Sequence, residues 1–112
     1  MKTLAIRLDP QFFDNPDADI RYRLPDLLVA RSRGVIAGDG YDYIGPQPLM
    51  VVFLKTSQLK SALEFILDVI ENVPVLGCNL RSAVVAVERK TGWEVVYPPG
   101  FTEPFLPNSK PA

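Results

Sequence analysis

The stretch "LMVVFLKTSQLKSALEFILDVIENVP", residues 49–74, contains the two clearest secondary-structure signals in the chain. Residues 49–56 form a continuous apolar run rich in strand-forming residues, which is typical of a strand covered on both faces. Residues 57–73 follow with apolar side chains at three- and four-residue spacing and polar side chains between them. This spacing predicts an amphipathic helix, with Ser57 as its N-cap and Pro74 just beyond its end.

Shorter elements are expected upstream of this unit. Residues 3–8, "TLAIRL", alternate apolar and other side chains, which predicts a half-buried strand. Residues 9–20 contain two prolines and four aspartates, so they are expected to form an irregular connection. A short helix should follow in "LPDLLVARSRG", with Pro25 in its first turn and Gly34 at its C-terminal end.

Downstream of the long helix, residues 82–88 and 93–97 are expected to pair as a hairpin around Lys90-Thr91-Gly92. Together with a strand after the short helix, the order is βαββαβ plus one C-terminal strand. This order predicts an α+β fold, a ferredoxin-like split βαβ sandwich in which an antiparallel sheet carries two helices on one face.

The size and composition predict one domain followed by a tail. The 112 residues, 47% of them hydrophobic and 22% charged, suit a single hydrophobic core. We expect this domain to occupy residues 1–97. Residues 98–112 hold five prolines in fifteen residues and form a Pro-rich C-terminal tail, in which Phe101 and other apolar side chains are able to dock on the body.

The segment "GDGYDY", residues 38–43, raises the main question about binding. Its spacing fails the pattern of an EF-hand calcium loop, and no lysine or helix start follows it as a phosphate loop requires. Asp39-Gly40 is therefore interpreted as a turn or bulge. If a strand follows, Tyr41 and Tyr43 share one face and Asp42 takes the other. The tyrosines then lie either on an open sheet face as a binding surface or against the helices or tail.

A second group of candidate binding residues lies in the acidic loop, at Asp14, Asp17 and Asp19. Their spacing matches no metal motif, and a solvated loop is the simplest interpretation. If the fold brings them near Asp39 and Asp42, they form an acidic patch.

Composition excludes several classes of chemistry. The chain has no histidine and one cysteine, so catalysis by Ser-His-Asp or Cys-His, zinc sites with histidine and intrachain disulfides are excluded. No cofactor is expected. The net charge of −1 without a basic cluster argues against nucleic-acid binding. No signal peptide or membrane span is evident, so a cytoplasmic location and no membrane partner are expected.

These observations favour a small cytosolic, non-enzymatic protein-binding domain. It would bind a protein partner or a second copy of itself through Tyr41, Tyr43 and the acidic residues, or through a sheet edge. An immunity-type inhibitor, of the kind found among small bacterial α+β proteins, is one form of this hypothesis, since an acidic patch can mask a basic active site. The alternative is a small carboxylate-based enzyme or ligand-binding domain that uses Asp39 and Asp42.

Overall fold

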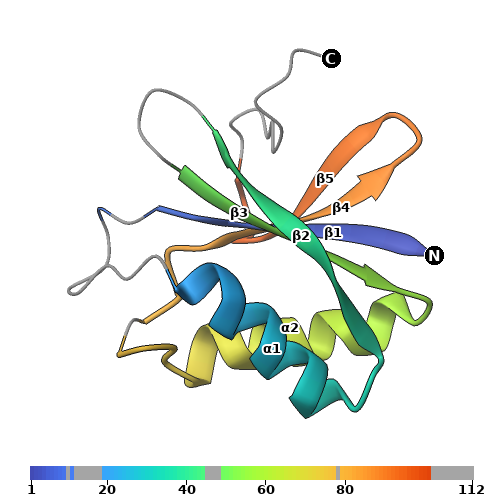
Figure 1. Ribbon diagram of the computed structural model, residues 1–112. Coiled ribbons are helices and arrows are strands. Elements are labelled where there is room, and N and C mark those ends of the chain that lie inside the picture. The colour runs from blue at the N-terminus through green and yellow to red at the C-terminus, as the bar shows by residue number, and fades with distance from the viewer. Residues whose placement is uncertain (10, 12–18, 45–48, 78, 102–112) are drawn as a thin grey trace.

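A computed structural model describes residues 1–9, 11, 19–44, 49–77 and 79–101. In these residues, five strands form one antiparallel sheet and two helices pack against it, which confirms an α+β fold. The elements are β1 (Lys2–Leu8), α1 (Ile20–Ser32), β2 (Ile36–Ile44), β3 (Leu49–Thr56), α2 (Leu59–Asn72), β4 (Val84–Arg89) and β5 (Gly92–Tyr97). The strand order is β2-β3-β1-β4-β5, so β2 and β5 are the two edges. Figure 1 shows both helices beneath the same face of the sheet.

The centre of the sheet is the pair of β1 and β3. Their register runs from Lys2 opposite Thr56 to Leu8 opposite Met50. Because side chains alternate along a strand, one set of side chains from both strands faces the helices and forms the main core with α1 and α2: Leu4, Ile6, Leu8, Met50, Val52 and Leu54. The sequence prediction of a buried strand at 49–56 is confirmed.

The long helix α2 is also confirmed, but its expected cap is wrong. The helix begins at Leu59 with Gln58 at the N-cap position, and no side chain caps it. The buried hydroxyl of Thr56 lies at this turn instead, accepting a hydrogen bond from the Gln58 amide at 3.0 Å. The same hydroxyl donates to the Val35 carbonyl at 2.7 Å. Thr56 therefore ties the start of α2 to the segment that leads into β2.

The first helix differs more from its prediction, because it begins at Ile20 rather than near Pro25. Pro25 lies inside the helix and leaves one backbone carbonyl without its usual intrahelical partner. Burial outweighs this loss, because Ile20, Leu24 and Leu28 recur every four residues and are all fully buried. The first turn therefore begins at Ile20, the last residue of the predicted irregular connection.

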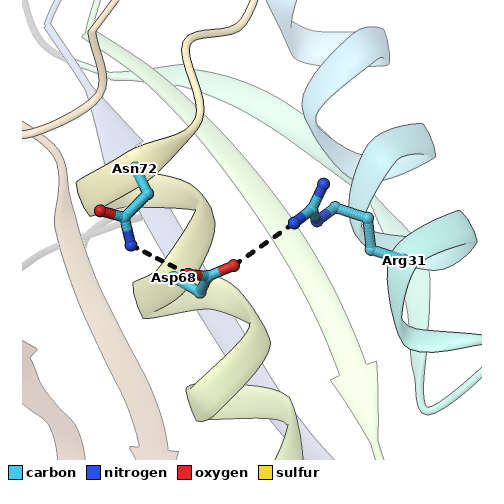
Figure 2. Close-up of polar contacts among 3 residues, drawn as sticks. All are labelled: Arg31, Asp68 and Asn72. Atoms are coloured by element: carbon cyan, nitrogen blue, oxygen red, sulfur yellow. Dashed lines mark hydrogen bonds and ion pairs between the residues drawn. The ribbon is translucent and has the colours of Figure 1, made fainter.

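The two helices are linked at the surface by a polar contact (Figure 2). The Nη2 atom of Arg31 on α1 lies 3.4 Å from Oδ2 of Asp68 on α2. The amide of Asn72 donates to the other carboxylate oxygen of Asp68 at 2.9 Å. Because both charged side chains are about half exposed, this link adds little to the packing of the apolar faces.

The opposite face of the sheet carries no helix in the described part of the chain. A small cluster of Ala5, Val51, Val84 and Ala86 is nevertheless buried there. The side chains that cover it are half-buried: Leu49, Phe53, Trp93, Val95 and Phe101. The docking of Phe101 on the body is thus confirmed, with the guanidinium of Arg7 5.6 Å from the centre of its ring. Residues 102–112 of the expected tail lie outside the described residues.

Candidate functional site

The segment 38–43 belongs to the edge strand β2 and contains a bulge. The register of β2 against β3 shifts between Gly38 and Tyr41, which confirms the bulge expected at Asp39-Gly40. Gly40 has a φ of 92°, a conformation that residues with a Cβ atom rarely adopt. The bulge restores regular pairing from Tyr41 to Ile44 and so sets the face on which each later side chain lies.

Tyr41 and Tyr43 lie on the face of the sheet that carries the helices. They pair opposite Val52 and Met50, both of which belong to the core beneath α1 and α2. The sequence left open whether the two tyrosines lie on the open sheet face or against the helices or tail. In the structure they lie on the helix side of the sheet. Asp42 pairs opposite Val51 on the other face.

The two tyrosines meet Arg21 and Tyr22 from the first turn of α1, and we call these four residues the tyrosine–arginine cluster. The rings of Tyr22 and Tyr41 pack edge to face with centres 5.6 Å apart. Tyr41 and Tyr43 pack in the same way at 6.1 Å. Such edge-to-face pairs are favourable because the positive rim of one ring meets the negative face of the other.

Arg21 lies at the centre of the cluster. Its Cζ atom is 4.7 Å from the centre of the Tyr22 ring and 5.2 Å from that of Tyr41. Its Nη1 atom donates a hydrogen bond of 2.7 Å to the hydroxyl of Tyr43. The Arg21 guanidinium therefore joins the start of α1 to the edge strand β2 through the cation–π contact with Tyr41 and the hydrogen bond to Tyr43.

The cluster is at the surface despite these internal contacts. Within the described residues, five large apolar or aromatic side chains are exposed, and three of them are Tyr22, Tyr41 and Tyr43. Their exposed fractions are 47%, 41% and 38%. A fixed aromatic surface of this kind offers contact area without the entropy cost of ordering flexible side chains.

The hydroxyl groups of Tyr22 and Tyr41 are 3.4 Å apart. The hydrogen bond from Tyr41 lowers the pKa of Tyr22 below its ordinary value, and the Arg21 guanidinium lowers it further by stabilising the phenolate. The same contact raises the pKa of Tyr41, because Tyr41 must keep its proton to donate it. Tyr22 is therefore the first of the two to ionise.

The predicted acidic residues do not gather into one site among the described residues. Asp39 forms an ion pair of 3.1 Å with Lys55 on β3. Asp42 accepts a hydrogen bond of 2.8 Å from the amide of Tyr43. Asp19 lies at the N-cap position of α1, near Tyr22. Asp14 and Asp17 lie outside the described residues, as does Cys78.

The surface beside Tyr22 is hollowed. Asp19, Tyr22, Arg23 and Leu76 line a shallow cavity of about 380 Å³. A neighbouring cavity of about 440 Å³ shares Arg23 and Leu76 and is otherwise lined by the residues Asp26, Leu27, Val73, Pro74 and Val75. The concave surface thus continues from the cluster along α1 to the loop after α2. Asp39 and Asp42 line neither cavity.

Within the described residues, no group of three or more acidic, cysteine or histidine side chains is arranged to hold a metal ion. Neither described helix is long and apolar enough to cross a membrane.

Arg21 and Tyr22 were not predicted as site residues. The helix was expected to start near Pro25, and a helix that starts there does not bring Arg21 and Tyr22 next to β2. The signal was the four-residue spacing of Ile20, Leu24 and Leu28, which extends the helix back to residue 20 and puts Arg21 and Tyr22 at its exposed side.

Comparisons of the chain with protein-family models, with curated proteins and with solved structures found no match.

Proposed function

We propose that this chain is a non-enzymatic protein-binding domain whose contact surface is centred on the tyrosine–arginine cluster. One observation carries the proposal: exposed Tyr22, Tyr41 and Tyr43 converge from two elements on one arginine. Tyrosine and arginine are enriched among the residues that contribute most to protein–protein binding. Their fixed geometry lowers the entropy cost of binding.

We also propose that the fold is a ferredoxin-like split βαβ sandwich. Its support is that β3 lies between β1 and β2, while α1 and α2 follow β1 and β3 along the chain. The strand β5 adds a fifth strand beyond the four of that pattern. In such a sandwich β2 is an edge strand, so a partner that contacts the cluster also reaches its unpaired backbone groups.

The partner defines two narrower forms of the proposal. In the first, the domain is an immunity-type inhibitor and the partner is a toxin. In the second, the partner is a second copy of the chain that contacts the same cluster. Size-exclusion chromatography with light scattering separates the two forms, because only self-association makes the apparent mass rise with concentration. No observation on the described residues favours the carboxylate enzyme.

Site-specific photo-crosslinking tests the proposal. The photoreactive amino acid p-benzoylphenylalanine replaces Tyr22 or Tyr41 in separate variants, so that an aromatic ring is retained at each position. A third variant carries it at Val29, which is also exposed on α1 but is not part of the cluster. Each variant is irradiated in a lysate of the source cells, and the crosslinked proteins are identified by mass spectrometry.

The proposal predicts that positions 22 and 41 crosslink to the same protein and that position 29 does not. Crosslinks that are absent at positions 22 and 41, or that are equally abundant at all three positions, contradict it.

A further inference from the structure

The bonding of Arg21 shows which chemical group the cluster is suited to receive. A guanidinium has five N–H donors and one positive charge. One Nη1 hydrogen is used by Tyr43. The Nε atom is buried and has no hydrogen-bond partner among the described residues. The remaining three N–H groups are on the two Nη atoms, at the far end of the side chain.

The positive charge of Arg21 is also not neutralised within the described chain. The ion pairs between described residues involve Arg31, Lys55 and Arg89. Arg21 instead contacts two aromatic rings and a hydroxyl. The two rings replace part of the water around the guanidinium, which strengthens the attraction of its free edge for an anion.

The surrounding hydroxyl groups complement this edge. The phenols of Tyr22 and Tyr43 accept hydrogen bonds from Tyr41 and Arg21, respectively, so their own O–H groups are able to donate to a ligand. A planar carboxylate accepts two parallel N–H bonds from an arginine and has further lone pairs for a hydroxyl. Of the described carboxylates around the cluster, Asp39 pairs with Lys55, Asp42 lies on the opposite sheet face and Asp19 lies at the N-cap position of α1. No ion pair between described residues joins any of them to Arg21.

We propose that the tyrosine–arginine cluster binds an acidic segment of the partner protein, with a glutamate or aspartate carboxylate held by the Arg21 guanidinium and the phenols around it. This inference rests on the proposed function and specifies the chemistry of the partner at that surface. The phenyl rings then contact the apolar stem of the acidic residue and its neighbours.

The experiment follows the NMR signal of the Arg21 Nε–H group and the amides of residues 21, 22, 41 and 43 in the full-length protein. The probe is a capped peptide of four glutamates alternating with glycines, and the matched control peptide carries glutamine in place of glutamate. The glutamate peptide is expected to shift these signals in a saturable way that weakens with added salt, and the glutamine peptide to leave them unchanged.

Two variants separate this contact from general charge attraction. Arg21→Gln and Lys55→Gln each remove one positive charge, but Lys55 lies on β3 outside the cluster. Arg21→Gln is expected to weaken binding of the glutamate peptide about tenfold or more, the loss of a charge-assisted hydrogen-bonded pair, and Lys55→Gln to change it less than about twofold. Tyr43→Phe provides a second test at the same site, with a loss smaller than that of Arg21→Gln.

Equal shifts with both peptides, no shift with the glutamate peptide, or equal effects of the two charge-removing variants would overturn the inference. Crosslinking at positions 22 and 41 with no response to the glutamate peptide overturns only the proposal that the partner presents an acidic segment to the cluster. Absence of crosslinking overturns the protein-binding function itself.

Discussion

At the scale of single residues, the position of the candidate surface depends on one glycine. Gly40 is the only residue of the β2 bulge with a positive φ, and the bulge sets which face carries Tyr41 and Tyr43. Without the extra residue, the strand from Tyr41 onward would present its other side chains to α1. The conformation of Gly40 is therefore coupled to the geometry of the cluster.

Replacing Gly40 with alanine is expected to destabilise the protein by about 1–2 kcal/mol, because a Cβ atom is unfavourable at positive φ. Gly38→Ala is the matched control. Its φ is not in that region and its Cβ atom would lie 4.0 Å from Cβ of Pro25, an ordinary contact, so little loss is expected. Urea denaturation of both variants measures the difference. Equal stability of the two variants would show that the bulge does not require the glycine.

The tyrosine pair gives a second prediction at this scale. Tyr22 is expected to ionise at lower pH than Tyr41, because Tyr41 and Arg21 stabilise its phenolate. Ultraviolet titration of Tyr41→Phe should show Tyr22 ionising at higher pH than in the native protein, since the donated hydrogen bond is lost. If the Tyr22 transition does not move, the hydroxyl contact does not control it.

The two shifts also have opposite effects on stability. Just below the ordinary tyrosine pKa, the native state holds fewer protons on Tyr22 than the unfolded chain does, so the contribution of Tyr22 to the free energy of unfolding rises with pH. Tyr41 keeps its proton longer in the native state, so its contribution falls as pH rises above that value. In Tyr41→Phe, the contribution of Tyr41 is absent. The contribution of Tyr22 remains but is smaller, because the hydrogen bond from residue 41 is lost.

At the scale of elements, the long segments were predictable and the entry into α1 was not. The strand at 49–56 is a long apolar run, and the long helix repeats apolar side chains at three- and four-residue spacing. Both patterns arise because these side chains are buried in the core, so they can be recognised in the sequence. The hairpin of β4 and β5 followed from its turn residues at Lys90 to Gly92.

The start of α1 and the cap of α2 were misassigned for a common reason. In both places, a local rule gave way to tertiary packing. Pro25 favours the first turn of a helix, but the buried side chain of Ile20 places that turn five residues earlier. Ser57 favours an N-cap, but Thr56 is buried and bonds both Gln58 and Val35. The tyrosine–arginine cluster depends on the early start of α1. The sequence therefore predicted Tyr41 and Tyr43 as site residues but not Arg21 and Tyr22.

The contact between α1 and α2 gives a prediction at the element scale. A double-mutant cycle of Arg31→Gln and Asp68→Asn is expected to give a coupling energy of about 0.2–1 kcal/mol, because both side chains are about half exposed. The coupling should shrink at 1 M salt, where screening is strong. A coupling well above this range, unaffected by salt, would show that the pair in Figure 2 is more important to helix packing than its exposure indicates.

At the scale of the whole molecule, one main core joins both helices to the sheet and holds α1 against β2. Ile66 is fully buried in that core, at the middle of α2. Ile66→Ala is expected to cost about 2–5 kcal/mol and Ile66→Val about 0.5–1.5 kcal/mol, as measured by chemical denaturation. Val29→Ala, at an exposed position of α1, should stay within about 0.5 kcal/mol of the native protein. A cost at Ile66 as small as at Val29 would contradict the packing described here.

The protein-binding function is tested most directly by the affinity for the protein identified by crosslinking. The dissociation constant is measured by calorimetry for the native chain, for the double variant Tyr22→Ser, Tyr41→Ser and for the control Val29→Ser, all at one salt concentration. If the tyrosine–arginine cluster is the binding surface, the double variant binds about tenfold or more weakly than the native chain, and the affinity of Val29→Ser is unchanged. An unchanged affinity in a double variant that remains folded by circular dichroism would contradict it.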